Sequence, residues 1–226
     1  MSSETELLAS LRRLSSPTVA NAVESFGVRV PDAGVSLGPL QCLFPEHGAL
    51  VGYACTALIA SGQPAGPERR VHRRAYWEYL TKVRQPRVVV MQDLTDPPAG
   101  AFWGEVNTNI HRVLGCIGLI TNGSVRDLDE VRPQSFPMFA GCVTVSHAYA
   151  HLEDFARPVR IGKLLVQPGD LVHADKHGVV IIPGELASEI PAAAARIERQ
   201  ERTIIDLCQS PHFSIEELDK LVAEGY

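Results

Sequence analysis

The apolar and polar positions along this chain repeat with helical and strand-like spacing in turn. In a helix, apolar side chains recur three and four residues apart, whereas a strand covered on both faces shows a continuous apolar run. The second predicted helix has Ser16 as its N-cap and Pro17 at its first position, and Gly27 ends it. The pattern predicts helices at residues 4–14, 16–27 and 68–83 and buried strands at residues 49–61 and 87–91.

The later part of the chain changes from alternating elements to strands and then to helices. Two apolar runs, residues 171–174 and 179–182, flank a polar turn and predict a hairpin. This order of elements predicts one α/β layered domain over residues 1–226, in which residues 185–226 form a C-terminal helical extension that contacts a neighbouring subunit. Further strand-like pieces lie at residues 136–140, 142–146 and 158–166, and helices are predicted at residues 185–207 and 214–224.

The segment at residues 104–130 carries the most informative chemistry. Its first part has apolar side chains on one face of a helix, and a short apolar run at residues 117–120 then predicts a buried strand. The turn Asn122–Gly123 follows and leads to Arg126 and Asp127. Ligands of α/β proteins commonly lie beyond the carboxyl end of such a strand, where a cation and an anion stand side by side. The apolar helix residues are Val106, Ile110, Val113 and Leu114.

Composition excludes several classes of protein. The net charge of the 226 residues is -5 and no block of Lys or Arg exceeds two adjacent residues, which gives no support to nucleic-acid binding. No apolar run reaches the roughly 18 to 20 residues of a membrane span. The acidic N-terminus lacks the features of a signal peptide, so we expect a cytoplasmic protein. Five widely spaced cysteines without a C-x-x-C pair predict reduced thiols.

Each charged residue of the central segment also has a purely structural interpretation. Ser124 and Asp127 have the spacing of a helix cap, so that Asp127 satisfies a helix N-terminus. Arg126 is then a surface ion-pair partner. Exposed helix charges are the corresponding interpretation of Glu105, Asp129 and Glu130.

His147 and His151 are four residues apart and would form a zinc pair if that piece were helical. No Glu of an H-E-x-x-H motif and no clear third ligand accompanies them, so structural or substrate-facing histidines are favoured. Trp103 is interpreted as a packing residue, with a pocket rim beside Gly104 as the alternative.

The spacing of the central acids and Arg126 resembles a known family signature. Glu105, twenty intervening residues, Arg126-Asp127, two residues and Glu130 match an acidic-x20-Arg-Asp-x2-acidic pattern. That pattern belongs to the RraA-like family, which includes the class II 4-hydroxy-4-methyl-2-oxoglutarate (HMG)/4-carboxy-4-hydroxy-2-oxoadipate (CHA) aldolases. The family's opening helix, its Gly-x-Ala-x-Thr strand and its late hairpin have counterparts near residues 14–23, 52–56 and 168–180.

The resemblance implies an RraA-like swivelling β/β/α sandwich, an α/β fold, and a homo-oligomer, trimer or hexamer. It implies that Arg126 grips the carboxylate of a pyruvyl group and that Asp127 holds a divalent metal, Mg²⁺ or Mn²⁺. Glu105 and Glu130 would contact the metal through water. The substrate-binding positions are Gly104, Val106, Asn107 and Arg126. An acid from the neighbouring subunit's C-terminal helix, Glu198 or Glu201, would complete the site.

The activity that the resemblance implies is a metal-dependent lyase, an aldolase that releases pyruvate from a small 2-oxo acid. Oxaloacetate decarboxylation is the expected side activity because it passes through the same enolate. The family also contains RraA regulators that bind and inhibit a ribonuclease, so a non-catalytic protein that binds a ribonuclease or another protein is the alternative. The resemblance assigns the chain no nucleic-acid partner and no membrane.

Overall fold

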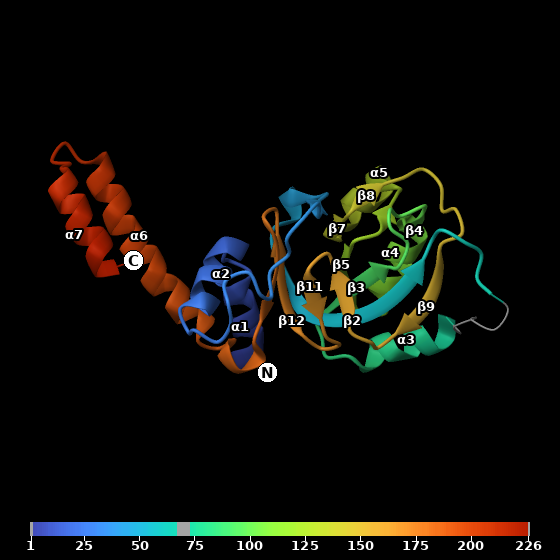
Figure 1. The fold of residues 1–226 in the computed structure, drawn as a ribbon. Coiled ribbons are helices and arrows are strands. Elements are labelled where there is room, and N and C mark those ends of the chain that lie inside the picture. The colour runs from blue at the N-terminus through green and yellow to red at the C-terminus, as the bar shows by residue number, and fades with distance from the viewer. Residues whose placement is uncertain (1, 67–72, 226) are drawn as a thin grey trace.

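A central mixed sheet of eight strands organises the protein (Figure 1). The computed structural model describes residues 2–66 and 73–225. Strand order is β1-β7-β5-β3-β2-β12-β13, with β9 also paired to β2; β7, β5, β3 and β2 are parallel. The strands are β1 (Gln41–Cys42), β2 (Leu50–Ala60), β3 (Arg87–Asp93), β5 (Cys116–Thr121), β7 (Met138–Ala140), β9 (His151–Phe155), β12 (Leu171–Asp175) and β13 (Gly178–Ile182).

Two smaller sheets accompany the central one. A hairpin of β10 (Val159–Ile161) and β11 (Leu164–Val166) packs over one face of the central sheet. Three short parallel strands form the other sheet, in the order β4-β6-β8. They are β4 (Ala101–Trp103), β6 (Ser124–Val125) and β8 (Cys142–Val143).

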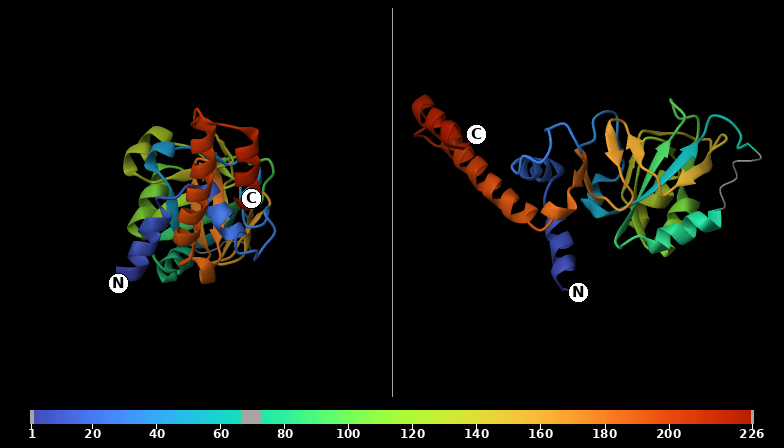
Figure 2. Two further views of the ribbon diagram at one scale, coloured as in Figure 1. Left: turned by 90° about the vertical axis from the view of Figure 1, so that its left-hand side faces the viewer. Right: turned by 60° about the horizontal axis from the view of Figure 1, so that its bottom comes forward.

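The helices form two groups that cover different parts of the central sheet (Figures 1 and 2). Helices α3, α4 and α5 connect the parallel strands and pack around β2, β3 and β5, whereas α1, α2 and the start of α6 form a layer beside β12 and β13. The helices are α1 (Ser2–Leu11), α2 (Ser16–Glu24), α3 (Arg73–Lys82), α4 (Glu105–Val113), α5 (Leu128–Val131), α6 (Ile190–Gln209) and α7 (Ile215–Gly225), with 3-10 turns η1 (Pro45–His47), η2 (Arg132–Gln134) and η3 (Gly184–Leu186).

Strand β3 explains why the parallel strands are continuously apolar. Successive side chains of a strand point to opposite faces. Val89 and Met91 pack toward α3 and α4, whereas Val88 and Val90 pack toward the β10–β11 hairpin. Because both faces are covered, a polar residue at either parity would be buried.

The predicted α/β architecture, both long buried strands and the late hairpin are confirmed. The predicted N-cap of α2, Ser16, is wrong by one residue: Ser15 accepts the Thr18 N–H. Ser16 is instead buried, with its hydroxyl 3.0 Å from Nδ1 of His173 on β12. The predicted helix at residues 68–83 is confirmed from residue 73 onward, and its part at residues 68–72 lies outside the described residues.

Helix α4 presents two valines of its apolar stripe to solvent rather than to the core, whereas Leu114 packs against the core. Val106 is 71% exposed and Val113 is 85% exposed. The buried residues of α4 are polar, Thr108 and His111. A surface helix normally places its apolar stripe inward, so this orientation depends on polar contacts beneath the helix.

The two C-terminal helices project from the domain (Figure 1). The first turns of α6 pack against α1 and α2 through Ile190, Ala193 and Ala194. Ser214 caps the last helix by accepting the Glu217 N–H. Within residues 2–66 and 73–225, no helix is long and apolar enough to cross a membrane.

Arg87, at the start of β3, holds the ends of two helices together. Its guanidinium is buried and donates to three main-chain carbonyl oxygens, of Thr81 in the last turn of α3, of Val83 just after α3 and of Leu114 just after α4. Helix C-termini leave carbonyl groups without partners and favour positive charge. One cation therefore fixes where α3 and α4 end.

Replacing Arg87 with Met should lower the free energy of unfolding by roughly 2–4 kcal/mol, because buried carbonyl groups lose their donors. Urea unfolding followed by circular dichroism measures this loss. Arg74→Met, which removes an exposed ion pair with Glu78, is the matched control and should change stability little. Equal effects of the two substitutions would contradict the assigned role of Arg87.

Candidate functional site

The candidate site lies where the β4–β6 pair ends. Trp103 is the last residue of β4, and its carbonyl oxygen accepts the N–H of Arg126 at 3.0 Å. This parallel pairing sets Arg126 and Asp127 beside the start of α4, at Gly104 and Glu105. Two segments that lie more than twenty residues apart in sequence are thereby joined at one place.

The Asp127 carboxylate forms the direct contact between these segments. Its Oδ2 accepts the backbone N–H of Glu105 at 3.0 Å. Asp127 stands at the N-cap position of α5 but makes no side-chain capping bond there. The carboxylate thus caps α4 rather than its own helix, and the capping interpretation from Ser124 and Asp127 is wrong about which helix is capped.

The backbone at Asp127 is left-handed, with φ 58° and ψ 45°. Asp is among the few residues other than Gly that adopt this region readily. The conformation accompanies the turn of the carboxylate back toward the N-terminus of α4, where the helix dipole and free N–H groups favour negative charge.

Gly104 is required by close approach. Its backbone is extended, so conformational freedom is not the reason for glycine here. A Cβ at this position would overlap Oδ2 of Asp127. Any side chain at residue 104 would therefore displace the carboxylate.

Arg126 and Asp127 form a pair that remains open to solvent. Nε of Arg126 lies 3.6 Å from Oδ1 of Asp127, and their side chains are 40% and 34% exposed. A cationic and an anionic group are thus available together to a small ligand. Glu105 and Glu130 are exposed, and no hydrogen bond among the described residues joins either carboxylate to Arg126 or Asp127.

The other predicted substrate positions are at the first turn of α4. Val106 is exposed, and the Asn107 side-chain amide donates to the carbonyl oxygen of Phe102. Since that amide is already engaged, the backbone N–H groups of this turn are the groups to consider for ligand binding.

A buried polar network beneath α4 was not recognised from the sequence. Nε1 of Trp103 donates to Oγ1 of Thr108, and Tyr76 lies 3.0 Å from Nε2 of His111. His111 Nδ1 faces the carbonyl oxygen of Asn107 and must carry the proton, so Nε2 accepts from the Tyr76 hydroxyl. Burial lowers the pKa of His111 to about 4 and keeps the ring neutral. The sequence signal for this network was a pair of polar residues three positions apart in α4, Thr108 and His111.

The histidine pair at 147 and 151 does not form a metal site. That segment is not helical: His147 is exposed in a loop, and His151, on β9, lies with Nε2 2.8 Å from Oε1 of Glu153. No cluster of three or more His, Cys, Asp or Glu side chains suited to a metal ion occurs within residues 2–66 and 73–225. Trp103 is 1% exposed and is a packing residue, not a pocket rim.

A separate groove of about 720 Å³ lies at the carboxyl ends of β3 and β5. Gln92, Asp93 and Asn122 line it, but Arg126 and Asp127 do not. Each carboxylate oxygen of Asp93 accepts a hydrogen bond within the protein, Oδ2 from the Ser61 hydroxyl and Oδ1 from the Thr95 N–H.

The donor set at Asp127 fits a hydrated divalent cation. Mg²⁺ prefers oxygen ligands, retains several waters and is commonly held by one or two carboxylates. Asp127 offers a carboxylate that is one-third exposed, with Oδ2 oriented by the Glu105 amide. A site with few protein ligands is consistent with this chemistry, whereas a structural zinc site would need four.

The chain matches the family model RraA-like (Aldolase/RraA) over residues 17–181 and belongs to that family. It is 25% identical over 203 residues to Protein DlpA of Legionella pneumophila, covering 88% of this chain but only 31% of DlpA. It is also 25% identical to a putative 4-hydroxy-4-methyl-2-oxoglutarate aldolase of Halalkalibacterium halodurans, covering 71% of this chain and 74% of that protein.

Among solved structures, the chain resembles Streptomyces coelicolor RraAS2, described as an unusual member of the RNase ES inhibitor RraA protein family. The TM-score is 0.69 at 26% identity, covering 88% of this chain and 94% of RraAS2. The RraA-like fold expected from the sequence is therefore confirmed. The family joins aldolases and RraA regulators, so membership alone does not choose between the two activities.

The neutral state of His111 makes stability depend on pH. The folded pKa, about 4, lies below the ordinary value of 6.5, so its contribution is complete above pH 6.5 and is lost as pH falls toward 4. The loss should reach roughly 3 kcal/mol. Unfolding free energies between pH 4 and 8 measure it, and His111→Gln should flatten this slope. His147→Gln, at an exposed position, should leave it unchanged; a slope unaffected by His111→Gln contradicts the assignment.

Gly104→Ala should break the contact between Asp127 and the Glu105 amide, because the added methyl group occupies the place of the carboxylate oxygen. We expect a loss of about 1–3 kcal/mol in stability, and a crystal structure of the variant should show Asp127 rotated away. Gly184→Ala is the control, since a Cβ there meets nothing within 4 Å. An unmoved Asp127 in the variant would rule out the close-approach argument.

Proposed function

We propose that this protein is a divalent-metal-dependent lyase that cleaves a small 2-oxo acid to pyruvate. The observation that carries the proposal is the solvent-open pair of Arg126 and Asp127, 3.6 Å apart beside the N-terminus of α4. The likeness to a putative 4-hydroxy-4-methyl-2-oxoglutarate aldolase supports a retro-aldol reaction on substrates of that type. Oxaloacetate decarboxylation is the expected side activity.

In the proposed reaction Arg126 binds the carboxylate of the pyruvyl part of the substrate. A guanidinium can donate two parallel hydrogen bonds to a carboxylate, which fixes both position and orientation. Backbone N–H groups at the first turn of α4, near Val106 and Asn107, complement the same negative charge. The substrate is thereby held with its keto group beside Asp127.

Asp127 would hold the divalent ion, Mg²⁺ or Mn²⁺, with Glu105 and Glu130 contributing through water. When bound, the ion supplies a Lewis acid that stabilises negative charge developing on the keto oxygen. The Asp127 oxygen that accepts the Glu105 amide is already oriented before any ion binds. The carboxylate does not have to reorient during the reaction, whereas water molecules would. The preoriented site therefore stabilises the transition state more than water does.

The retro-aldol step breaks one carbon–carbon bond of the substrate. Glu105, exposed at the start of α4, takes the proton of the C4 hydroxyl group through water. The C3–C4 bond then breaks, the former carbinol becomes a ketone, and the bonding electron pair passes to C3 of the pyruvate enolate. A proton returned to C3 yields pyruvate. With oxaloacetate, the same bond position releases carbon dioxide instead of a ketone.

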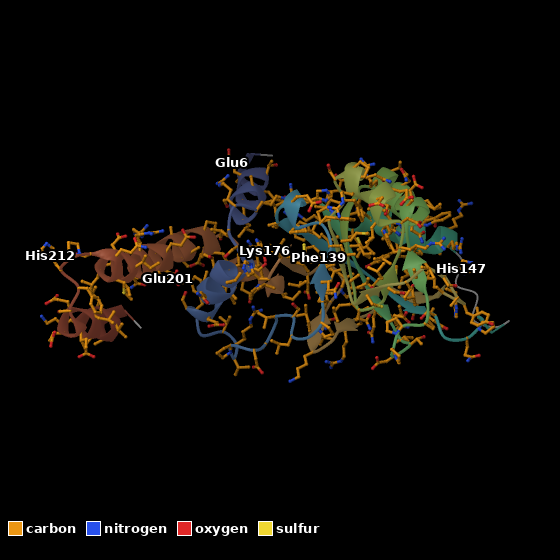
Figure 3. All side chains as sticks on the ribbon, turned by 90° about the horizontal axis from the view of Figure 1, so that it is seen from above. Glu6, Phe139, His147, Lys176, Glu201 and His212 are labelled. Carbon is orange, nitrogen blue, oxygen red and sulfur yellow. The ribbon has the colours of Figure 1, made fainter. Side chains whose placement is uncertain are left out.

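A homo-oligomer is part of the proposal. The α6–α7 hairpin lies at the opposite end of the molecule from α4 and α5 (Figure 1), and Figure 3 shows Glu201 far from His147. Glu198 and Glu201 therefore cannot complete the site of their own subunit. Either residue would have to act in a neighbouring subunit of a trimer or hexamer.

A regulatory role is the second candidate. The likeness to RraAS2, whose description places it in a ribonuclease-inhibitor family, supports it, as does the exposed apolar stripe of α4 at Val106 and Val113. A pull-down that recovers a stoichiometric protein partner would favour this role. In that case substitutions of Arg126 and Asp127 should leave partner binding intact.

Purified protein with Mg²⁺ should release pyruvate from oxaloacetate or 4-hydroxy-4-methyl-2-oxoglutarate, and chelation by EDTA should abolish the release. Arg126→Ala should raise KM on the order of 10²-fold, because the substrate carboxylate loses its charged partner. Asp127→Asn should remove the dependence on metal and lower kcat on the order of 10³-fold. A coupled lactate dehydrogenase assay follows pyruvate.

Asp129→Asn is the matched control, because this neighbouring carboxylate is exposed on α5 and should not affect the rate. The proposal is falsified if no 2-oxo acid in a broad panel gives metal-dependent pyruvate above the solution rate. Equal losses in Asp127→Asn and Asp129→Asn would remove the assigned role of Asp127.

A further inference from the structure

Trp103 is hydrogen-bonded to both segments of the candidate site. Its main-chain carbonyl oxygen accepts the Arg126 N–H at 3.0 Å, and its indole Nε1 donates to Oγ1 of Thr108 at 2.9 Å. Trp103 and Thr108 are almost completely buried, with 1% and 0% exposure. One residue, through its main chain and its side chain, therefore connects the segment after β6, which carries Arg126, to the helix that begins at Glu105.

The Thr108 hydroxyl is also hydrogen-bonded to Gly104. An indole nitrogen can only donate, so the hydroxyl accepts from Trp103 and is free to donate its own hydrogen. It donates to the carbonyl oxygen of Gly104 at 3.0 Å, which also accepts the Thr108 N–H at 3.0 Å. These bonds fix the carbonyl oxygen of Gly104. The Asp127 carboxylate lies close to the α-carbon of the same residue, where a Cβ would overlap Oδ2.

Neighbouring rings restrict the indole. The Trp103 ring centroid lies 4.3 Å from that of His111 and 5.9 Å from that of Phe136. His111 is in turn bonded to Tyr76 on α3. In a buried, low-dielectric environment such linked bonds reinforce one another and are costly to leave unmade. Within residues 2–66 and 73–225, the hydrogen-bond partner of the indole N–H is Oγ1 of Thr108.

We propose that Trp103 is a positioning residue: its indole N–H sets the first turn of α4 at the distance from Arg126 at which both can bind one carboxylate. This inference rests on the proposed function. A displacement of about 1 Å between groups that must act together can cost on the order of 10²-fold in rate. Val106 and Val113 of the apolar stripe of α4 face solvent, so hydrophobic packing holds only part of the helix, and the polar bond supplies the register of its first turn.

The test compares variants that remove single groups. Trp103→Phe removes the indole N–H and keeps an aromatic ring, and Thr108→Val removes the hydroxyl at nearly constant volume. Thr108→Ser restores the hydroxyl. Trp77→Phe is the matched control, because Trp77 packs at the edge of the same core. The readouts are kcat and KM with oxaloacetate and Mg²⁺, the Tm, and amide hydrogen exchange over residues 104–108.

We expect Trp103→Phe and Thr108→Val to lower kcat/KM at least tenfold and to speed exchange over residues 104–108, with a fall in Tm of only about 2–4 °C. Thr108→Ser and Trp77→Phe should stay within about threefold of wild type. Trp103→Phe behaving like Trp77→Phe in both rate and exchange would overturn the inference.

The exchange measurement separates this inference from the proposed function. If the wild-type protein releases no pyruvate, the proposed function fails, and exchange alone then decides about Trp103. Faster exchange confined to residues 104–108 in Trp103→Phe supports the positioning role. Unchanged exchange, or an increase spread evenly over the chain, contradicts it.

Discussion

The hydrogen bond from the Glu105 amide to the Asp127 carboxylate is the contact on which the rest of the site depends. It joins a helix N-terminus to the segment after β6, and it requires a residue without a side chain at position 104. It also requires left-handed backbone at Asp127 itself. The absence of a side chain at residue 104 and the left-handed backbone at Asp127 are both explained by this one interaction. The bond from the Glu105 amide orients the carboxylate, and the rest of the carboxylate stays exposed to a ligand.

Helix α4 is supported in an unusual way. Thr108 and His111 are buried against Trp103 and Tyr76, and Val106 and Val113 of its apolar stripe are exposed. A helix held by hydrophobic area alone can slide or rotate at little cost, since that force has no direction. Hydrogen bonds have defined geometry, so the buried polar contacts of α4 fix both the rotation of the helix about its axis and its distance from the core. The exposed valines then leave an apolar surface beside the site, which suits contact with another protein chain.

Much of the fold followed from the sequence because its signals were strong. The runs that became β2 and β3 are continuously apolar, and the turn between β12 and β13 is flanked by matching apolar pairs. The sheet of β4, β6 and β8 could not be predicted, since two or three residues are too few to show a period. Hydrophobic periodicity shows that α4 has an apolar stripe but not what covers that stripe. The exposure of Val106 and Val113 could therefore not be predicted from the sequence. The Arg126–Asp127 pairing was suggested by the family signature, and its contact with Glu105 required the three-dimensional structure.

The most direct test is a crystal structure of the protein with Mn²⁺ and oxalate, a planar dianion that resembles pyruvate enolate. The account predicts an anomalous peak at the Asp127 carboxylate, with oxalate between that ion, the Arg126 guanidinium and the first-turn amides of α4. Manganese bound elsewhere, or oxalate away from Arg126, would contradict the claim that these two residues form one ligand site.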